Sequence, residues 1–423
     1  MRSDFDAVLI GAGCAGLFTA LELAKNGVGC LLLDRLPIGS YASTSNQGWL
    51  QSGALYAGLG QMDVAAACKE GSELLRTRCP DAVGSDMDGY FLFDQRHHVD
   101  KFILNCEKAN IEAEETRLDD IPERIIRNSR FPFALAVRDC PFDSHRILSS
   151  VASEAANCGV AIESAGDLSS IKVTRLQDRW QVSYGSSGVT VTSDSVVLSG
   201  GAYISPLLKS LANRSSKSIH TTRITVMGLE YPPLLKSLLA APATDNAPNI
   251  VPFKSGKRLG VTISLTKADV PSDPTNLEVP DKEVVDVGLQ LSYWFPEILP
   301  VLKGRDVPVT VYSCQKIEQR DLNSSGQPAN RKHLLVDHSK TDDPNLVGLF
   351  SFYPGKFTSS PIVARECAAA VLSVLPVGKR RQAISRQNLD VKVAVQKFLG
   401  DPSHIAVVRN GALEFERISG ASP

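Results

Sequence analysis

The feature that most constrains this chain is a glycine-rich turn near its start, set between an apolar run and a helix-like pattern. Residues 7–10 read Ala-Val-Leu-Ile and lead directly into the Gly-Ala-Gly-Cys-Ala-Gly of residues 11–16. Such an apolar run indicates a strand buried on both faces. The pattern up to residues 26–27 is that of a helix, and a second apolar run over residues 29–33 ends at Asp34. This order of elements predicts an α/β nucleotide-binding unit with a parallel sheet.

Each residue type in this unit has a physical task in binding a dinucleotide. Gly11 lets the chain turn sharply, Gly13 lets the backbone approach a pyrophosphate, and Gly16 lets the helix pack closely on the strand. The free N–H groups of the helix start face the phosphates. Asp34 stands at a strand end, where its carboxylate can accept from a ribose 2′-OH and would repel the 2′-phosphate of NADP. A chance glycine-rich turn is the alternative, but it does not explain why a second strand and Asp34 follow at the spacing of a dinucleotide-binding unit.

Length, charge and cysteine usage narrow the classes of protein to which the chain can belong. A length of 423 residues predicts more than one domain, and a net charge of −1 gives no field that would attract nucleic acid. The nine cysteines are scattered without a CxxC pair or metal-type spacing, which favours a reducing, cytoplasmic location and argues against an iron–sulfur cluster or another metal. We expect no transmembrane segment. A basic stretch over residues 379–392 is interpreted as a solvated helix face, with peripheral contact to anionic lipid as the alternative.

Further along the chain, two more apolar runs end in small residues. Residues 195–201 finish in Gly200 and Gly201, and residues 346–352 enter a turn over 353–359 that precedes another helix. Between the first unit and these runs lies a polar segment over residues 40–49, whose hydroxyl and amide groups are suited to wrap a cofactor. A plain surface loop is the alternative interpretation.

Taken together, these segments resemble the FAD-dependent oxidoreductases of the D-amino-acid oxidase superfamily, and in motif order the flavin-linked glycerol-3-phosphate dehydrogenases. The resemblance covers roughly residues 5–375. Residues 43–56 are similar to the family segment that passes over the flavin, and residues 353–359 look like its Gly-Gly-Lys-Leu-Thr-Thr turn. Gln51 stands where the family has histidine and Leu55 where it has arginine, whereas Tyr56 is kept.

The resemblance implies an α/β fold in which a Rossmann-like FAD-binding domain is interleaved with an α+β substrate domain. We predict a discontinuous FAD-binding domain over 1–60, 140–205 and 335–378, a helical insertion over 61–139, a substrate domain over 206–334 and a C-terminal tail over 379–423. The insertion includes a helix expected over 117–127.

The resemblance also assigns roles to individual residues. Lys356, Tyr56 and Gln51 are the predicted catalytic residues, and Lys316 and Arg331 are predicted to bind an anionic substrate. Non-covalent binding of FAD is expected, because residues 353–360 contain no cysteine or histidine to link the ring. The predicted cofactor-binding residues are Gly11, Gly13, Ala15, Gly16, Asp34, Arg35, Ser43, Thr44, Ser45, Gln47, Gly48, Gly200, Gly201, Gly355, Lys356, Phe357 and Thr358.

The predicted activity is oxidation of a CH–OH or CH–NH centre of a small anionic substrate by hydride transfer to flavin N5, with oxygen or another electron acceptor. Reduced flavin carries negative charge, which a cation such as Lys356 would stabilise. Alcohol oxidation needs a base, and Gln51 cannot act as one. An amine substrate avoids that need, so an amino-acid or secondary-amine oxidase that releases hydrogen peroxide is one alternative. A catalytically silent FAD-binding partner is another, and a flavin monooxygenase ranks third.

Overall fold

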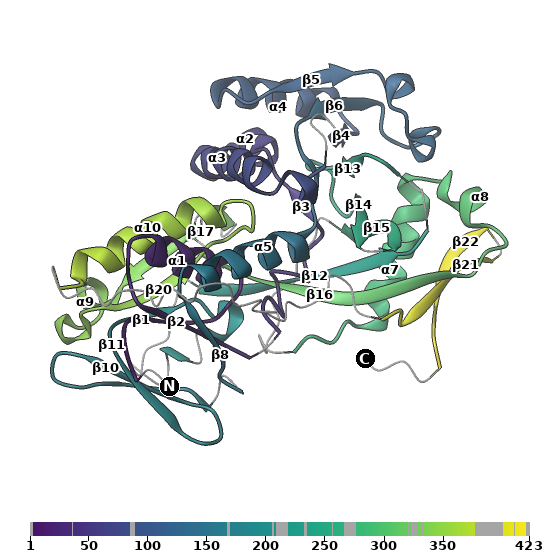
Figure 1. Cartoon of the computed structure of the whole chain (residues 1–423). Coiled ribbons are helices and arrows are strands. Elements are labelled where there is room, and N and C mark those ends of the chain that lie inside the picture. Colours follow the sequence, from purple (N-terminus) through teal and green to yellow (C-terminus); the bar gives the residue numbers. More distant parts are fainter. Residues whose placement is uncertain are drawn as a thin grey trace. The chain divides into compact units, whose positions relative to one another are not determined.

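The computed structural model describes residues 3–35, 37–84, 89–166, 170–204, 207–208, 219–231, 235–255, 257–265, 276–319, 321–322, 328–330, 333–376, 401–409 and 411–419 (Figure 1). The chain divides into two compact units, each built from several segments. Unit 1 comprises residues 1–44, 145–221 and 316–396, and unit 2 comprises residues 45–144, 222–315 and 397–423.

Unit 1 is organised on an eight-stranded sheet with the main order β19-β20-β11-β1-β2-β8. The strands from β20 to β8 are parallel, β19 is antiparallel to β20, and β9 and β10 extend β11 as an antiparallel meander. The elements are β1 (Asp4–Ile10), α1 (Cys14–Lys25), β2 (Cys30–Asp34), α5 (Ser144–Asn157), β8 (Ala161–Ser164), β9 (Lys172–Arg175), β10 (Trp180–Tyr184), β11 (Val189–Leu198), β17 (Asp321–Leu322), β18 (Pro328–Asn330), β19 (Leu334–Asp337), α9 (His338–Thr341), β20 (Leu349–Tyr353) and α10 (Ser360–Val374).

The apolar runs of the sequence become the central strands of this sheet. Ala7, Val8, Leu9 and Ile10 of β1 are all fully buried, as expected for a strand covered on both faces. The expected hairpin forms between β10 and β11, and β11 then continues as the parallel neighbour of β1. The sheet therefore places the ends of β1, β2, β11 and β20 along one edge, which is where α/β folds bind ligands.

Unit 2 contains a ten-stranded sheet in the order β22-β21-β16-β12-β15-β14-β13-β4-β6-β5, and its long strands β12 and β16 are prominent in Figure 1. The elements are β3 (Trp49–Leu50), α2 (Ala54–Gly58), α3 (Met62–Arg78), β4 (Gly89–Phe93), α4 (Arg96–Lys108), β5 (Ala113–Thr116), β6 (Phe133–Val137), β7 (Cys140–Pro141), β12 (Ile219–Leu229), β13 (Leu238–Ala240), β14 (Pro248–Ser255), β15 (Arg258–Leu265), α7 (Asp281–Trp294), α8 (Ile298–Leu302), β16 (Val307–Gln319), β21 (His404–Arg409) and β22 (Ala412–Arg417).

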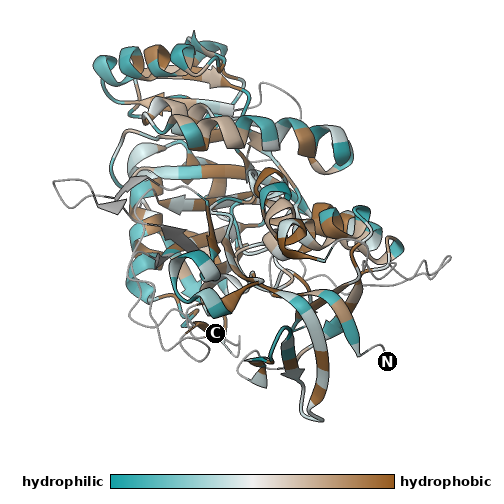
Figure 2. Cartoon of the chain, turned by 90° about the vertical axis from the view of Figure 1, so that its left-hand side faces the viewer, coloured by the Kyte–Doolittle hydropathy of each residue, from teal (hydrophilic) through white to brown (hydrophobic). Residues whose placement is uncertain are grey.

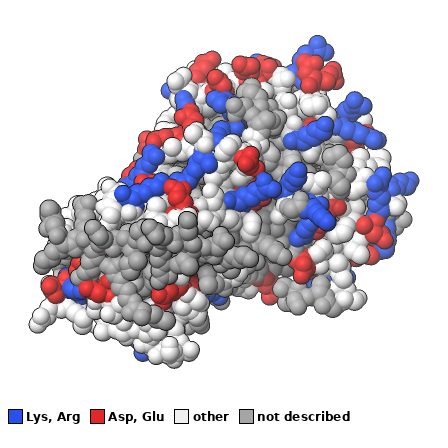
Figure 3. Space-filling model, viewed as in Figure 1, with Lys and Arg blue, Asp and Glu red and all other residues white. Residues whose placement is uncertain are grey.

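Helices of unit 2 pack on this sheet through one apolar side. In α4, Val99, Phe102 and Cys106 are buried at helical spacing, while most of the helix is polar. This mixed hydropathy is visible on the helices at the top of Figure 2. On the described surface shown in Figure 3, Lys and Arg are interspersed with Asp and Glu. Within the described residues, no helix combines the length and apolarity needed to span a bilayer.

The structure groups the chain differently from the predicted domain boundaries. Strands β4, β5 and β6, from the expected insertion over 61–139, stand in the same sheet as β12–β16 of the expected substrate domain. Strands β21 and β22, from the expected tail, join that sheet too, because β21 pairs with β16. The prediction of a helix over 117–127 is wrong, because Leu118–Asp120 and Arg124–Ile126 form two short 3-10 turns instead. The basic stretch over 379–392 lies outside the described residues.

Candidate functional site

The first glycine turn brings together residues that are far apart in the sequence. Gly11 has φ of 113°, and a Cβ there would lie 2.5 Å from the Cα of Gly200. A Cβ on Gly16 would lie 1.9 Å from the carbonyl oxygen of Gly11. The Ser199 amide donates to the Ile10 carbonyl at 2.8 Å, which joins the end of β11 to the end of β1. The predicted residues Gly11, Gly16, Gly200 and the neighbouring Gly201 therefore gather at one edge of the sheet.

A second strand–turn–helix unit meets the first at the starts of two helices. The Ser360 hydroxyl, at the start of α10, lies 3.1 Å from the Cys14 sulfur at the start of α1. Neither helix has a side-chain cap or an acidic residue in its first turn, among the residues that the structure describes. The Cys14 amide donates to the Ser43 hydroxyl at 3.0 Å. Two positive helix ends thus converge where Gly13, Ala15 and Ser43 lie, which suits phosphate groups.

Asp34 ends β2 beside this turn. Its carboxylate accepts from the amide of Ala12 at 2.5 Å and from the amide of Arg35 at 2.6 Å. Burial raises the pKa of Asp34 from 3.8 to about 6, against the lowering effect of those two amides and of the Arg35 charge. A carboxylate whose charge is costly to bury gains from further hydroxyl donors.

Two tyrosines that the sequence prediction missed lie next to Arg35, the residue that follows Asp34. The Arg35 guanidinium carbon lies 4.2 Å from the Tyr41 ring centroid and 5.5 Å from that of Tyr203. The two phenol oxygens are 2.8 Å apart. The three side chains provide flat aromatic and cationic faces of the kind that stack on a planar base. Tyr203 follows the Gly200-Gly201 pair, and this position after the apolar run of β11 was the signal in the sequence that could have identified it.

The turn between β20 and α10 holds the remaining predicted cofactor residues. Gly355 has φ of 70°, and the Lys356 amide donates to the Pro354 carbonyl at 2.7 Å. Hydroxyl groups of Ser359 and Ser360 donate to the Lys356 carbonyl at 3.3 and 2.9 Å. Lys356 is only 8% exposed and Thr358 only 1%, whereas Phe357 is partly buried. A lysine is rarely buried to this extent unless its charge is paired.

In unit 2, the segment that follows Thr44 is docked on the large sheet. The Thr262 hydroxyl donates to the Gln47 carbonyl at 2.6 Å, and the Gln47 amide group donates to the Ser264 hydroxyl. Gly48 is buried, and its amide donates to the Asn46 side chain at 2.7 Å. Ser45 and Gln47 are partly buried, while the hydroxyl of Thr44 in unit 1 donates to the Gly39 carbonyl at 2.7 Å.

The predicted catalytic pair Gln51 and Tyr56 is in contact within unit 2. The Gln51 side-chain nitrogen donates to the Tyr56 hydroxyl at 3.3 Å. Tyr56 is 3% exposed and belongs to an apolar cluster with Phe102 and Val251. Its ring is therefore part of the core, with the hydroxyl directed to Gln51.

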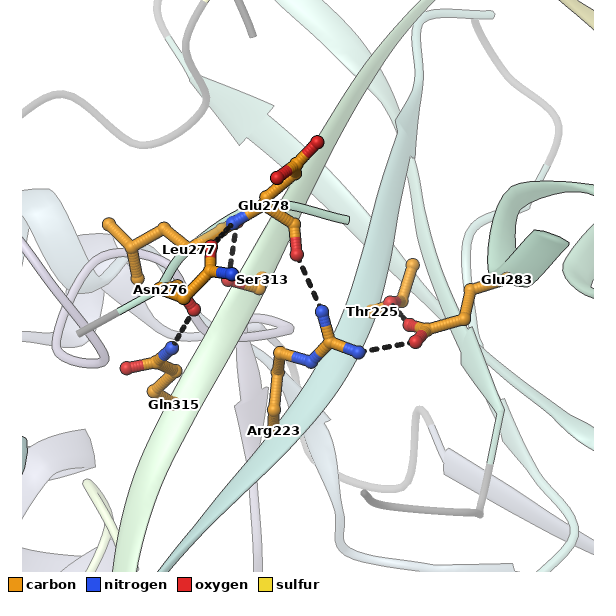
Figure 4. A network of polar contacts seen from close by, with 8 residues as sticks. All are labelled: Arg223, Thr225, Asn276, Leu277, Glu278, Glu283, Ser313 and Gln315. Carbon is orange, nitrogen blue, oxygen red and sulfur yellow. Dashed lines mark hydrogen bonds and ion pairs between the residues drawn. The ribbon is translucent and has the colours of Figure 1, made fainter. Parts of the chain in front are cut away.

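A polar network on β12 and β16 fixes the chain that precedes α7 (Figure 4). The Arg223 guanidinium donates to the Glu283 carboxylate and, at 2.5 Å, to the Glu278 carbonyl. The same carboxylate accepts from Thr225. Ser313 donates to the Leu277 carbonyl at 3.0 Å, and Gln315 donates to the carbonyl of residue 276. Of the predicted substrate-binding residues, Lys316 follows Gln315 in β16 with its side chain outside the described part, and Arg331 lies outside the described residues.

The parallel sheet and its glycine edge define a dinucleotide-binding protein, and the comparisons with known proteins identify the family. The family model for FAD dependent oxidoreductases matches residues 6–370, so the chain belongs to that family. Along almost its full length, 98%, it is 24% identical to one of the subunits of the anaerobic glycerol-3-phosphate dehydrogenase of Haemophilus influenzae, covering 74% of that protein.

Solved structures show the same fold at low sequence identity. Glycine oxidase from Geobacillus kaustophilus matches with a TM-score of 0.67 at 18% identity, covering 88% of this chain and 95% of that one. The L-alpha-glycerophosphate oxidase of Mycoplasma pneumoniae, solved with FAD bound, matches with a TM-score of 0.64 at 12% identity, covering 88% and 95%. The chain is thus an FAD-dependent oxidoreductase, and nothing in the comparisons supports the silent-partner alternative.

Proposed function

We propose that this enzyme oxidises a small anionic substrate at a CH–NH or CH–OH centre. The observation that carries the proposal is the buried lysine in the β20–α10 turn, where two helix N-termini converge. Bound FAD would supply the acceptor of a hydride equivalent. The chain's own groups would bind the cofactor, balance the charge that arrives with the hydride, and orient the substrate.

The described residues of unit 1 fit FAD. Gly13 has no side chain to obstruct a pyrophosphate, and the starts of α1 and α10 supply positive helix ends. Asp34 would accept from a ribose hydroxyl, and Arg35 with Tyr41 and Tyr203 would stack on the adenine. Gly200, Gly201 and the residues from Gly355 to Thr358 complete the proposed binding set.

The pKa of Asp34 predicts how FAD binding depends on pH. In the apoprotein this pKa is raised to about 6, and hydroxyl donors favour the ionised form. The affinity for FAD should therefore fall as the pH drops through 6, by about tenfold between pH 7 and pH 5. The folding stability of the apoprotein depends on pH in the opposite sense. Because the pKa of Asp34 is raised in the folded state, the contribution of this group to stability is lost as the pH rises from about 4 to 6. Fluorescence titration of apoprotein with FAD measures the first effect; in Asp34→Asn the drop should disappear.

FAD should be released from the protein by denaturation. The turn over 353–360 offers no cysteine or histidine, and Cys14, the thiol at the meeting helix ends, is buried with a raised pKa because burial disfavours its thiolate. Acid precipitation should leave the yellow colour in the supernatant. Colour that remains with the pellet would show a covalent link and overturn this prediction.

A small anion is supported as the substrate class by the chemistry of the related proteins. The relatives and structural neighbours are named for glycerol 3-phosphate, glycine and, in the oxidase from Chelativorans sp. BNC1, iminodiacetate. In these compounds an anionic group is attached directly to the oxidisable carbon or is carried by the neighbouring carbon. Lys316 and Arg331 remain our candidates for binding that group, Arg331 in bidentate fashion.

Gln51 favours a C–N centre over a C–OH centre. An alcohol must lose its hydroxyl proton to a base as the hydride leaves, and a glutamine side chain has no basic form near neutral pH. The Gln51 amide nitrogen donates to Tyr56, while its carbonyl oxygen has the chemistry to accept a hydrogen bond from an amine. A neutral amine needs no further base before it donates a hydride.

Anaerobic mixing of the purified yellow protein with a metabolite panel tests the proposal. Bleaching by glycine, iminodiacetate or another small amino acid would establish C–N oxidation, and bleaching by glycerol 3-phosphate would establish C–OH oxidation. In air, stoichiometric hydrogen peroxide distinguishes an oxidase from a dehydrogenase. If neither small anionic amines nor small anionic alcohols bleach the flavin, the proposed substrate class is wrong.

A further inference from the structure

A fully buried carboxylate lies directly behind the segment that carries Gln51. Asp139 stands between β6 and β7 and is 0% exposed. It accepts from the Trp49 indole nitrogen at 2.6 Å, from the Ser52 amide at 2.8 Å, and also from the Ser52 hydroxyl. One side chain therefore binds the segment on both sides of Gln51.

The same stretch is held by backbone pairing and by the start of a helix. Strand β3 pairs with β7, with Trp49 opposite Pro141 and Leu50 opposite Cys140. The Ser52 hydroxyl also lies 3.4 Å from the Ala54 amide, at the start of α2. Gln51 is the residue of this stretch that carries a predicted catalytic group, and its side chain reaches Tyr56 one helical turn later.

Burying Asp139 is costly, and the surroundings compensate only in part. Burial raises the pKa of Asp139, while the Ser52 and Trp49 donors and the charge of Arg76 lower it. Arg76 also bonds to the Arg138 carbonyl at 2.6 Å and to the Cys140 sulfur at 3.0 Å, on both sides of Asp139. The β3–β7 pairing already joins the two segments, so a charged residue is not needed to connect them. What the carboxylate adds is a fixed geometry for residues 49–52.

We propose that Asp139 is a positioning residue that sets the orientation of Gln51 by holding Trp49 and Ser52. The inference rests on the proposed function, in which the Gln51 carbonyl oxygen accepts a hydrogen bond from a substrate amine. Asp139 itself does not touch the substrate; it acts through the Gln51 backbone, which has Ser52 as its immediate neighbour.

The primary test compares Asp139→Asn with a matched control. Glu123 is a second buried carboxylate of unit 2, 5% exposed, and accepts from the amides of Lys236 and Ser237 at 2.9 and 2.7 Å. Asp139→Asn should slow flavin reduction at saturating substrate by about 10- to 100-fold, the range expected when a catalytic group is misplaced. FAD content should stay at the parent level. Glu123→Gln should lower the melting temperature without changing the reduction rate. Equal rates in the Asp139→Asn and parent proteins would overturn the inference.

A double-mutant cycle shows whether the effect passes through Gln51. When Gln51→Ala is already present, adding Asp139→Asn should slow reduction by less than about twofold, because a group that is absent cannot be misplaced. A full additive effect would mean that Asp139 acts by another route, and the inference would be wrong. If Asp139→Asn does not fold, Trp49→Phe replaces it, since this change removes a single donor and keeps an aromatic ring; a smaller slowing of the same kind is expected.

Hydrogen exchange separates this inference from the proposed function. Peptides that contain residues 49–56 should exchange their amide hydrogens faster in resting Asp139→Asn than in the parent. In Glu123→Gln the exchange rate of the same peptides should be unchanged. If no substrate bleaches the parent flavin, the proposed function fails, and the exchange result still decides whether Asp139 orders the Gln51 segment. Unchanged exchange in Asp139→Asn would contradict the inference in either case.

Discussion

Lys356→Met is expected to slow flavin reduction by substrate by roughly 30- to 1,000-fold. Transfer of a hydride places negative charge on the flavin, and a fixed cation that is present before the reaction stabilises that charge in the transition state. Loss of one such preorganised group raises the barrier by about 2–4 kcal/mol. Lys356 is 8% exposed, so water would not replace its charge readily. Anaerobic stopped-flow absorbance gives the rate, and FAD content should hardly change.

The control for this prediction is Lys340→Met. Lys340 belongs to the same unit, but its side chain is 80% exposed and pairs with Asp337 at 3.0 Å. Removal of an exposed charge has little effect on a reaction elsewhere, so the reduction rate should match that of the parent. If Lys356→Met reduces its flavin as fast as Lys340→Met, the cation that serves the flavin must be sought outside this turn.

Gly16→Ala is expected to abolish retention of FAD. The added Cβ would lie 1.9 Å from the backbone oxygen of Gly11 and 2.5 Å from the Ser199 hydroxyl. Backbone cannot yield as a flexible side chain can, so the start of α1 must move away from β1 and β11. We expect a loss of roughly 3 kcal/mol in the free energy of unfolding, at the upper end of overpacking effects. The ratio of flavin to protein absorbance after gel filtration measures retention, and thermal unfolding measures the cost.

Gly27→Ala provides the comparison at the other end of the same helix. Gly27 follows α1 with φ of 75°, and an added Cβ would meet nothing within 4 Å. The substitution should therefore cost only the backbone strain of a left-handed residue, about 1–2 kcal/mol, and keep FAD bound. Loss of FAD in both variants would show that general destabilisation, rather than the clash at Gly16, is responsible.

The strands, glycine turn and helix at the start of unit 1 could be predicted from the sequence because their signals are local. Apolar runs, glycine turns and Asp34 are contiguous in the chain, and their geometry follows from backbone sterics. The resemblance then linked the turn at 353–359 to the turn at 11–16. Contact between the two at Ser360 and Cys14 follows from the order of β20, β11 and β1 in the sheet. The FAD-dependent oxidoreductase family assigned from these motifs is confirmed.

The sequence could not predict features that depend on pairing between distant segments. Residues 61–139 read as an independent helical block, because β4, β5 and β6 are short and their partner β13 lies far along the chain. Residues 117–127 contain enough charged and branched residues to suggest a helix, yet Pro122 interrupts them and two 3-10 turns form instead. Tyr203 and Asp139 were overlooked for the same reason: each gains its role from a residue that only folding brings near.

The contact between Cys14 and Ser360 also has a consequence for how the enzyme is made. These residues are 346 positions apart in the chain, and the strand that precedes Ser360 is a direct neighbour of β11 in the sheet. A ribosome releases the first glycine turn long before β20 and α10 exist. Until β20 is made, the side of β11 that pairs with β20 is an open edge, which can pair with other chains. With the β20–α10 turn as part of the proposed FAD site, we expect that site to be complete only after β20 has joined the sheet.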